Sequence, residues 1–120
     1  MEKSESLAAL AALAQETRLD IFRLLVRAGS DGRPVGAIAE SLHLPSATLS
    51  FHLTQLKHAG LVTYRRDGRS LIYSANYQAM TELMAYLTEN CCGGEAADCS
   101  VDVAACPPAA PPLSKKSQNA

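Results

Sequence analysis

The feature that most constrains the fold is the dipeptide Asp67-Gly68, which lies between two stretches rich in β-forming residues. Asp-Gly favours a tight two-residue turn, because both central residues of such a turn need positive φ angles. Residues 61–66 alternate in polarity, and residues 69–75 return as a second strand-like stretch. The sequence therefore predicts a two-stranded β-hairpin at this point of the chain.

Apolar residues recur at helical spacing in five further segments. Ser4 or Ser6 can cap the first helix and Ser46 the fourth, since short polar side chains bind the exposed backbone N–H groups at helix starts. Thr17 begins the second helix, and Gly60 stops the fourth. The predicted helices cover residues 4–15, 17–28, 35–43, 46–58 and 76–92.

The first predicted helix carries Leu7, Leu10 and Ala14 on one face. Such a face packs closely against another helix, either in the core or at a dimer seam. A domain of this size has little stability to spare when it is alone, and a homodimer buries more surface.

Leu44-Pro45 separates two short helices, and a basic hairpin follows the second of them. Two short helices joined by a tight break, followed by such a hairpin, are the parts of a winged helix-turn-helix. The expected fold class is therefore mainly α with a two-stranded β-hairpin wing, in one domain.

The fourth predicted helix is expected to turn Leu49, Leu53 and Leu56 inward. Hydroxyl and amide groups on its opposite face can bind base edges in the major groove of DNA, and an apolar ring can meet a thymine methyl group. Alternatively, these polar groups are hydrated surface and the ring touches a protein partner. The candidate DNA-binding residues of this helix are Ser46, Ala47, Thr48, Ser50, Phe51 and Gln55, with His52 at the flank.

The charge distribution agrees with a DNA-facing centre. The net charge is −1, which is not the strongly basic balance of an obvious nucleic-acid binder. Residues 17–75, however, hold eight basic and four acidic side chains, whereas residues 76–106 hold five acidic and no basic ones. On the hairpin, Arg65, Arg66 and Arg69 are expected to reach phosphates or the minor groove.

Residues 1–6 lack the basic and apolar regions of a secretory signal, and no stretch of about 18 apolar residues predicts a membrane span. The expected location is the cytoplasm, with no membrane partner.

Taken together, these motifs resemble the ArsR/SmtB family of metal-responsive repressors. The resemblance covers about two-thirds of the chain. It implies a homodimer built on the first and fifth helices, which binds a partly palindromic double-stranded operator and leaves it when an inducer binds. The matching stretches are residues 38–44, 46–53, 56–62 and 66–73.

Two inducer sites of that family are absent from this chain. One uses cysteines in the third helix, where this chain has Leu42-His43-Leu44, and the other uses Asp and His on the fifth helix, where residues 76–90 have neither. What remains is a late cluster of Cys91, Cys92 and Cys99. Gly93-Gly94 lets the chain turn back, so that three thiolates can surround one soft centre.

Three sulfurs without a fourth ligand suit pyramidal As(III) or Sb(III), and some arsenic-responsive family members look similar here. We therefore expect As(III) or Sb(III) as the inducer, bound by Cys91, Cys92 and Cys99. Other interpretations stay open. Cys106 can add a fourth thiol for zinc, cadmium is another soft metal, and two thiols suit an organoarsenical. A disulfide redox switch and a segment without function are the remaining alternatives.

No catalytic residues or catalytic cofactor are predicted. An enzyme such as an arsenate reductase needs a low-pKa thiolate beside an anion-binding loop. Here Glu89, Glu95 and Asp98 lie near the cysteines and disfavour the thiolate. The expected organisation is a winged helix-turn-helix and dimerisation domain at 1–92, a cysteine-containing inducer segment at 91–106, and a disordered tail at 107–120.

Overall fold

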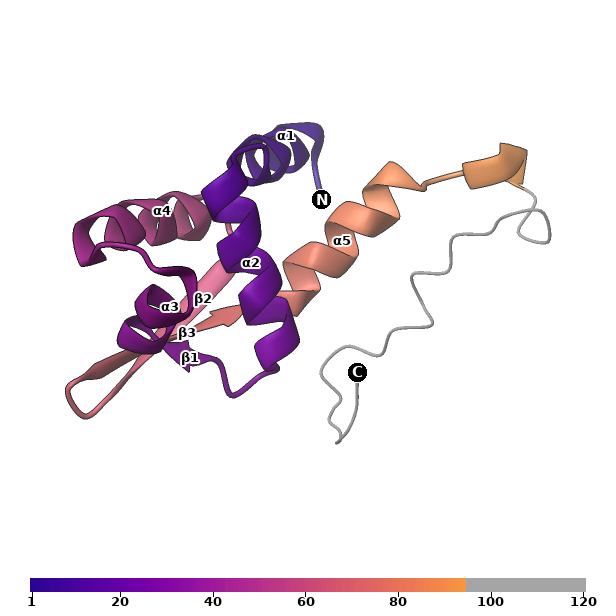
Figure 1. The fold of residues 1–120 in the computed structure, drawn as a ribbon. Coiled ribbons are helices and arrows are strands. Elements are labelled where there is room, and N and C mark those ends of the chain that lie inside the picture. The colour runs from indigo at the N-terminus through magenta and orange to yellow at the C-terminus, as the bar shows by residue number, and fades with distance from the viewer. Residues whose placement is uncertain (95–120) are drawn as a thin grey trace.

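The computed structural model describes residues 1–94, which form five α-helices and three β-strands (Figure 1). The predicted cysteine segment beyond residue 94, with Cys99 and Cys106, and the predicted tail at 107–120 lie outside the described residues. The elements are α1 (Lys3–Leu13), α2 (Glu16–Ala28), β1 (Arg33–Pro34), α3 (Val35–Leu42), α4 (Ser46–His58), β2 (Val62–Asp67), β3 (Ser70–Ala75) and α5 (Tyr77–Leu87), followed by a 3-10 turn at Cys91–Gly94.

The predicted hairpin is confirmed. β2 and β3 pair antiparallel, with Tyr64 opposite Tyr73 and Asp67 opposite Ser70. The two turn residues are Gly68 and Arg69 rather than Asp67 and Gly68, and Gly68 alone takes a positive φ, of 64°. The strand β1 pairs with the other edge of β3, so that the sheet order is β1-β3-β2. The sequence did not indicate β1, because a two-residue strand is too short to show an alternating pattern. The fold is a winged helix-turn-helix, as expected.

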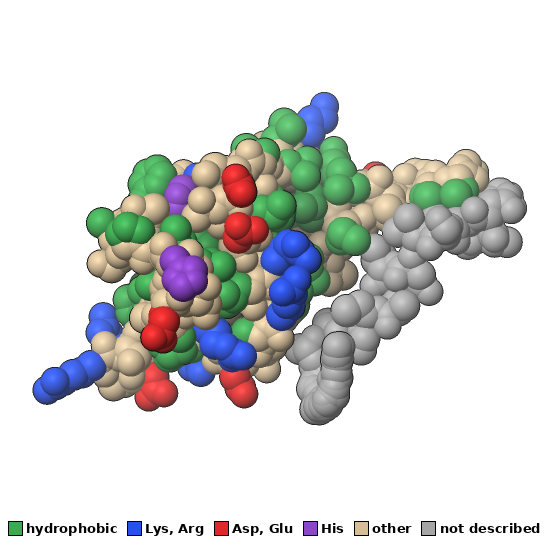
Figure 2. All heavy atoms as spheres, viewed as in Figure 1, with side chains coloured by type: hydrophobic (Ala, Val, Ile, Leu, Met, Phe, Trp, Pro, Cys, Tyr) green, Lys and Arg blue, Asp and Glu red, His purple; other side chains and the backbone are tan. Residues whose placement is uncertain are grey.

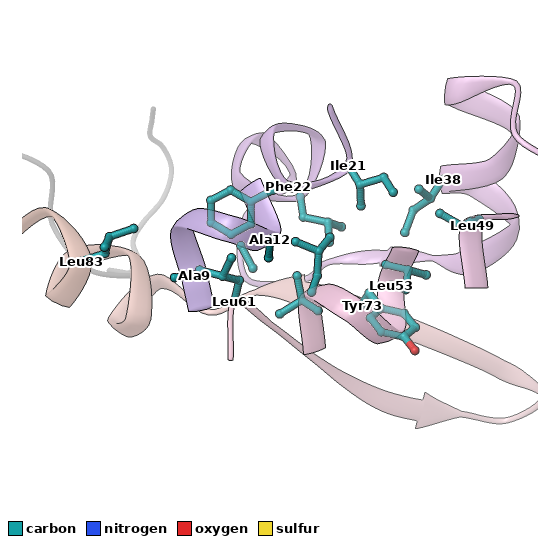
Figure 3. Close-up of a cluster of buried hydrophobic side chains, with 14 residues drawn as sticks. Ala9, Ala12, Ile21, Phe22, Ile38, Leu49, Leu53, Leu61, Tyr73 and Leu83 are labelled. Carbon is teal, nitrogen blue, oxygen red and sulfur yellow. The ribbon is translucent and has the colours of Figure 1, made fainter. Parts of the chain in front are cut away.

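One hydrophobic core joins the helices to the base of the hairpin (Figure 3). The three inward residues predicted for α4, namely Leu49, Leu53 and Leu56, are buried in it. They meet Ile21 and Leu25 of α2 in the same cluster. The packing of these aliphatic side chains fixes α4 against α2 and leaves the other face of α4 outside.

Of the two roles expected for the Leu7 and Leu10 face of α1, a place in the core of the single chain does not apply. Ala9 and Ala12 are buried, whereas Leu7 is 59% exposed and Leu10 is exposed as well. Small side chains let α1 approach the core closely, and no core partner covers the leucine face in the described chain. Neither Ser4 nor Ser6 caps the helix, because Glu2 is the cap residue and Ser6 is buried.

Two other helix starts also differ from the prediction. α2 begins at Glu16 rather than Thr17, because the Gln15 side chain accepts a hydrogen bond of 2.9 Å from the Arg18 backbone N–H. Pro45 is the cap residue of α4, so Ser46 is its first helical residue and does not cap it.

The sequence indicated a helix that continues to Cys92, but α5 ends at Leu87. Thr88 donates its hydroxyl to the Met84 carbonyl oxygen at 2.8 Å. Asn90 and Cys92 then take φ angles of 56° and 57°, in the left-handed region that interrupts a right-handed helix. The two cysteines therefore lie in a turn beyond α5. None of the helices among residues 1–94 is long and apolar enough to cross a bilayer.

A buried polar contact connects α2 with α4. His52 is 9% exposed, and its Nδ1 lies 3.5 Å from a terminal guanidinium nitrogen of Arg18. Burial, and secondarily the positive charge of Arg18, lowers the pKa of His52 from its ordinary value of 6.5. The folded protein therefore favours the neutral imidazole.

Gly32 is expected to tolerate alanine much less well than Gly29. Both have positive φ angles, of 73° and 83°, so each substitution is expected to cost about 1 kcal/mol in backbone strain. A Cβ at Gly32 would also collide with the Tyr73 carbonyl oxygen and the Ser74 hydroxyl, whereas one at Gly29 meets nothing within 4 Å. Urea unfolding should show about 2 kcal/mol more destabilisation for Gly32→Ala. Equal losses would contradict the steric argument.

The free energy of unfolding is expected to decrease as the pH falls below about 6.5, because the unfolded chain binds a proton at His52 more readily than the folded chain does. This stabilisation is complete above 6.5 and is lost as the pH falls through the lower folded-state pKa. Urea unfolding from about pH 7.5 to about pH 5 should show a shallower pH dependence for His52→Gln. His58→Gln, at an exposed site on α4, is the control and should keep the wild-type dependence.

Candidate DNA-binding surface and thiol pair

The outer face of α4 is exposed, as expected from the burial of its leucines. Phe51 is 58% exposed, which is unusual for a large apolar ring that serves only the fold. The exposed residues predicted for this face are Ser46, Ala47, Thr48, Ser50, Phe51 and Gln55, and we call them the α4 outer face.

The assignment of His52 to the DNA-facing set was wrong. The side chain is buried beside Arg18 and does not belong to the α4 outer face. The position of His52 in the sequence already indicated the inner side of the helix. His52 follows Leu49 by three residues and precedes Leu56 by four, and both intervals place it on the inner side of the helix.

The wing presents Arg65, Arg66 and Arg69, which are all exposed. Figure 2 shows basic side chains projecting at the tip of the wing. Arg65 differs from the other two, because its guanidinium donates a hydrogen bond of 3.0 Å to the Asp31 carbonyl oxygen. Arg66 and Arg69 flank the turn at Gly68, where their side chains are accessible to an anionic partner.

Lys57 and Tyr64 connect α4 to the wing, a contact that the sequence did not indicate. The Lys57 Nζ lies 5.0 Å from the centre of the Tyr64 ring, within the range of a cation–π contact. Tyr64 also packs beside Tyr73 of β3, with ring centres 5.5 Å apart. An exposed tyrosine close after a lysine-bearing helix end was the available signal.

α4 and the wing extend toward the same side of the molecule (Figure 1). A helix of this kind fits the major groove of B-DNA, and arginines on a neighbouring hairpin can bind phosphates. The arrangement is therefore suited to contacting a duplex at two adjacent places.

Cys91 and Cys92 place their sulfur atoms 3.4 Å apart in the turn that follows α5. Cys92 is exposed and has φ and ψ angles of 57° and 36°. The described residues contain no group of three or more His, Cys, Asp and Glu side chains suited to a metal ion. The other predicted sulfur ligand, Cys99, lies outside the described residues.

An apolar groove of about 320 Å³ lies between α2 and α5. It adjoins the exposed residues Met84 and Leu19. The lining residues are Leu13, Leu19, Phe22, Arg23, Val26, Arg27, Leu61, Met80, Leu83 and Met84. The sequence did not indicate this groove, because it depends on how α5 leaves the sheet.

Comparison with known proteins supports the helix-turn-helix assignment. Residues 13–65 match a family model described as a helix-turn-helix domain. The chain is 34% identical to the nodulation protein NolR of Rhizobium meliloti over 67% of its own length and 63% of NolR. It is 35% identical to the transcriptional activator HlyU of Vibrio cholerae, over 70% of this chain and 80% of HlyU.

A third relative is named as an arsenical resistance operon repressor, ArsR, of Halobacterium salinarum. The identity is 38% over 63% of this chain and 58% of that protein. The chain thus spans less than two thirds of the length of both NolR and this relative.

Solved structures also resemble this chain in fold and are named as regulators of this kind. An ArsR-like transcriptional regulator from Rhodococcus sp. RHA1 aligns with a TM-score of 0.63 and 27% identity, over 70% of this chain and 76% of that one. A homodimeric winged helix-turn-helix DNA-binding domain from Mycobacterium bovis aligns with a TM-score of 0.59 and 28% identity, over 78% and 86%. The winged fold and these relatives show that the chain belongs to the ArsR/SmtB family of transcriptional regulators.

Proposed function

We propose that this regulator is a repressor that binds operator DNA as a homodimer and releases it when As(III) or Sb(III) binds to Cys91, Cys92 and Cys99. The observation that carries the proposal is the pairing of two exposed features on one chain. The α4 outer face lies beside a basic wing, and two sulfur atoms lie 3.4 Å apart at the end of α5.

DNA binding is supported by the chemistry of the exposed residues. Ser46, Thr48 and Ser50 lie in the first turns of α4, where a recognition helix contacts base edges. Their hydroxyl groups can donate and accept, and Gln55 offers an amide. Arg66 and Arg69 on the wing supply charge for phosphates on the flanking backbone.

Dimerisation is supported by apolar surface that the single chain leaves exposed. On α1 these residues are Leu7 and Leu10, and on α5 they are Met84 and Leu87, of which Leu87 is 56% exposed. Figure 2 shows apolar side chains gathered over α1 and the near part of α5. Two copies joined there would present two α4 helices to successive major grooves, about 34 Å apart, as in other helix-turn-helix dimers.

The thiol pair fits one soft centre. Two thiolates on a common metal lie about 2.3 Å from it, so their sulfurs are about 3.3 to 3.8 Å apart for bond angles between about 90° and about 110°. The observed 3.4 Å falls in that range. Gly93, at a φ of 66°, turns the chain, and Cys99, further along the sequence, is the proposed third ligand.

The binding reaction balances without a change of oxidation state. Arsenite is present in water as As(OH)₃, and three thiols replace its three hydroxyl groups. Three As–S bonds form, three As–O bonds break, and the thiol protons leave with the hydroxyl groups as three water molecules. A soft thiolate set favours such a centre over hard, oxygen-seeking cations.

Arg66→Gln and Arg69→Gln are expected to weaken binding to every duplex, whatever its sequence. Each lost phosphate contact should reduce the slope of log K against log salt concentration by about 1 per protomer. Fluorescence anisotropy at several salt concentrations measures this slope. Arg27→Gln, at an exposed site on α2, serves as the control and should leave the slope unchanged. An unchanged slope in both wing variants would exclude the wing from the DNA interface.

Cys91→Ser and Cys92→Ser are expected to bind operator DNA like the wild type but to stay bound when arsenite is added. A hydroxyl group is a poor ligand for a soft centre, so each change removes one of three bonds. Anisotropy of the DNA complex, titrated with arsenite, antimonite, zinc and hydrogen peroxide in turn, measures release.

Cys106→Ser is the matched control in the same titrations, because Cys106 is not among the three proposed ligands and the variant should release DNA as the wild type does. Loss of release in this variant would show that a fourth thiol takes part. If both Cys91→Ser and Cys92→Ser still release DNA with arsenite, the inducer site lies elsewhere. Release of the wild type by zinc alone would indicate a four-thiol site instead, and release by peroxide alone would indicate a redox switch.

A further inference from the structure

Phe51 and His52 are neighbours on α4 but lie in different environments. Phe51 belongs to the α4 outer face, whereas His52 is buried. Their rings nevertheless touch, with centres 5.4 Å apart and planes at 65°, in the edge-to-face arrangement that aromatic rings favour. The buried ring therefore supports the exposed one.

His52 is itself held in place by Arg18. The Arg18 guanidinium can only donate hydrogen bonds, so the Nδ1 atom of His52 that faces it at 3.5 Å must act as the acceptor. This requires a neutral ring that carries its proton on Nε2. A fixed tautomer and a fixed partner leave the imidazole with one orientation, and the Phe51 ring packs against that orientation.

Arg18 is anchored at two further points. Its Nε donates a hydrogen bond of 2.7 Å to the Ala12 carbonyl oxygen, in the last turn of α1, and its backbone N–H is bound by Gln15. The carbonyl groups in the last turn of a helix lack partners within it and attract positive charge. One side chain therefore connects the end of α1, the start of α2 and the inner side of α4.

We propose that Arg18 and His52 are positioning residues that hold the Phe51 ring in the orientation in which it meets a thymine methyl group. They thereby set sequence discrimination, although His52 itself is buried away from DNA. The inference rests on the proposed DNA-binding function and extends it to residues inside the fold. An exposed phenylalanine without this support would sample several rotamers and lose part of its selectivity.

The hydrogen bond from Arg18 to Ala12 connects the support of the Phe51 ring to α1. α1 carries the exposed leucines that the proposed dimer would cover, and its last turn holds Arg18 through Ala12. A shift of α1 relative to α2 changes the position of the guanidinium and, through His52, the support of Phe51. The state of the dimer interface is thus connected to the reading of DNA.

The experiment uses a duplex selected from a random library by the wild-type full chain, and copies in which single thymines are replaced by deoxyuridine. This replacement removes only the C5-methyl group. For the wild type, one such replacement should reduce affinity about fourfold, the effect of losing the burial of one methyl group. Phe51→Ala should bind both duplexes equally, because the contacting ring is gone.

His52→Leu and Arg18→Met are expected to lose the same thymine preference although they retain Phe51. His52→Gln should restore it in part, since its amide oxygen can accept from Arg18. His58→Leu, on the exposed side of α4, is the matched control and should keep the wild-type preference. Affinity for a scrambled duplex and the thermal midpoint, measured for each variant, separate a loss of positioning from a loss of folding.

The outcomes are distinguishable. If His52→Leu and Arg18→Met fold and keep the fourfold preference, the positioning role is wrong. If the wild type selects a duplex but shows no thymine preference at any position, Phe51 does not read a methyl group and the inference is overturned, while the proposed function stands. If the wild type selects no duplex, the proposed function fails and the inference fails with it.

Discussion

The packing of α4 against α2 decides which side chains of α4 remain exposed, and the proposed function depends on that outcome. Leu49, Leu53 and Leu56 are buried against a cluster that includes Ile21 and Leu25. Because a helix turns by about 100° per residue, burial of this stripe leaves the opposite face in solvent. Small polar residues and one phenylalanine occupy that face, next to a hairpin tipped with arginines.

Much of this arrangement could be predicted from the sequence, because its determinants are local. Asp67-Gly68 marks the end of β2 and the start of the wing's turn, and the leucine spacing of α4 specifies its inner face. The sequence left open what tertiary packing decides. α1 buries Ala9 and Ala12 in preference to Leu7, since close approach of the helix to the core requires small side chains. From the sequence alone, the leucine face could lie either in the core or at a dimer seam.

The vicinal thiols are evident from the sequence, but their geometry is not. The sequence identifies Cys91 and Cys92 as vicinal thiols, yet it indicated a continuous helix through them. In the structure α5 ends at Leu87, and left-handed residues on both sides of Cys91 keep the helix from resuming. The two sulfur atoms lie 3.4 Å apart. Asparagine adopts the left-handed region more readily than most residues, so Asn90 was the available signal for the turn that follows α5.

The turn at Cys91–Gly94 lies at the far end of α5, away from α4 and the wing (Figure 1). In the proposed mechanism, arsenic bound at the cysteines weakens DNA binding through a change in how α5 and α1 pack. Coupling further requires that the bound form prefer the arrangement that fits DNA less well, since an inducer with equal affinity for both arrangements shifts neither. The contact of Arg18 with the last turn of α1 is one physical route for that preference. It turns a displacement at the exposed face of α1 into a change in the support of Phe51, without requiring α4 to unfold or to leave the core.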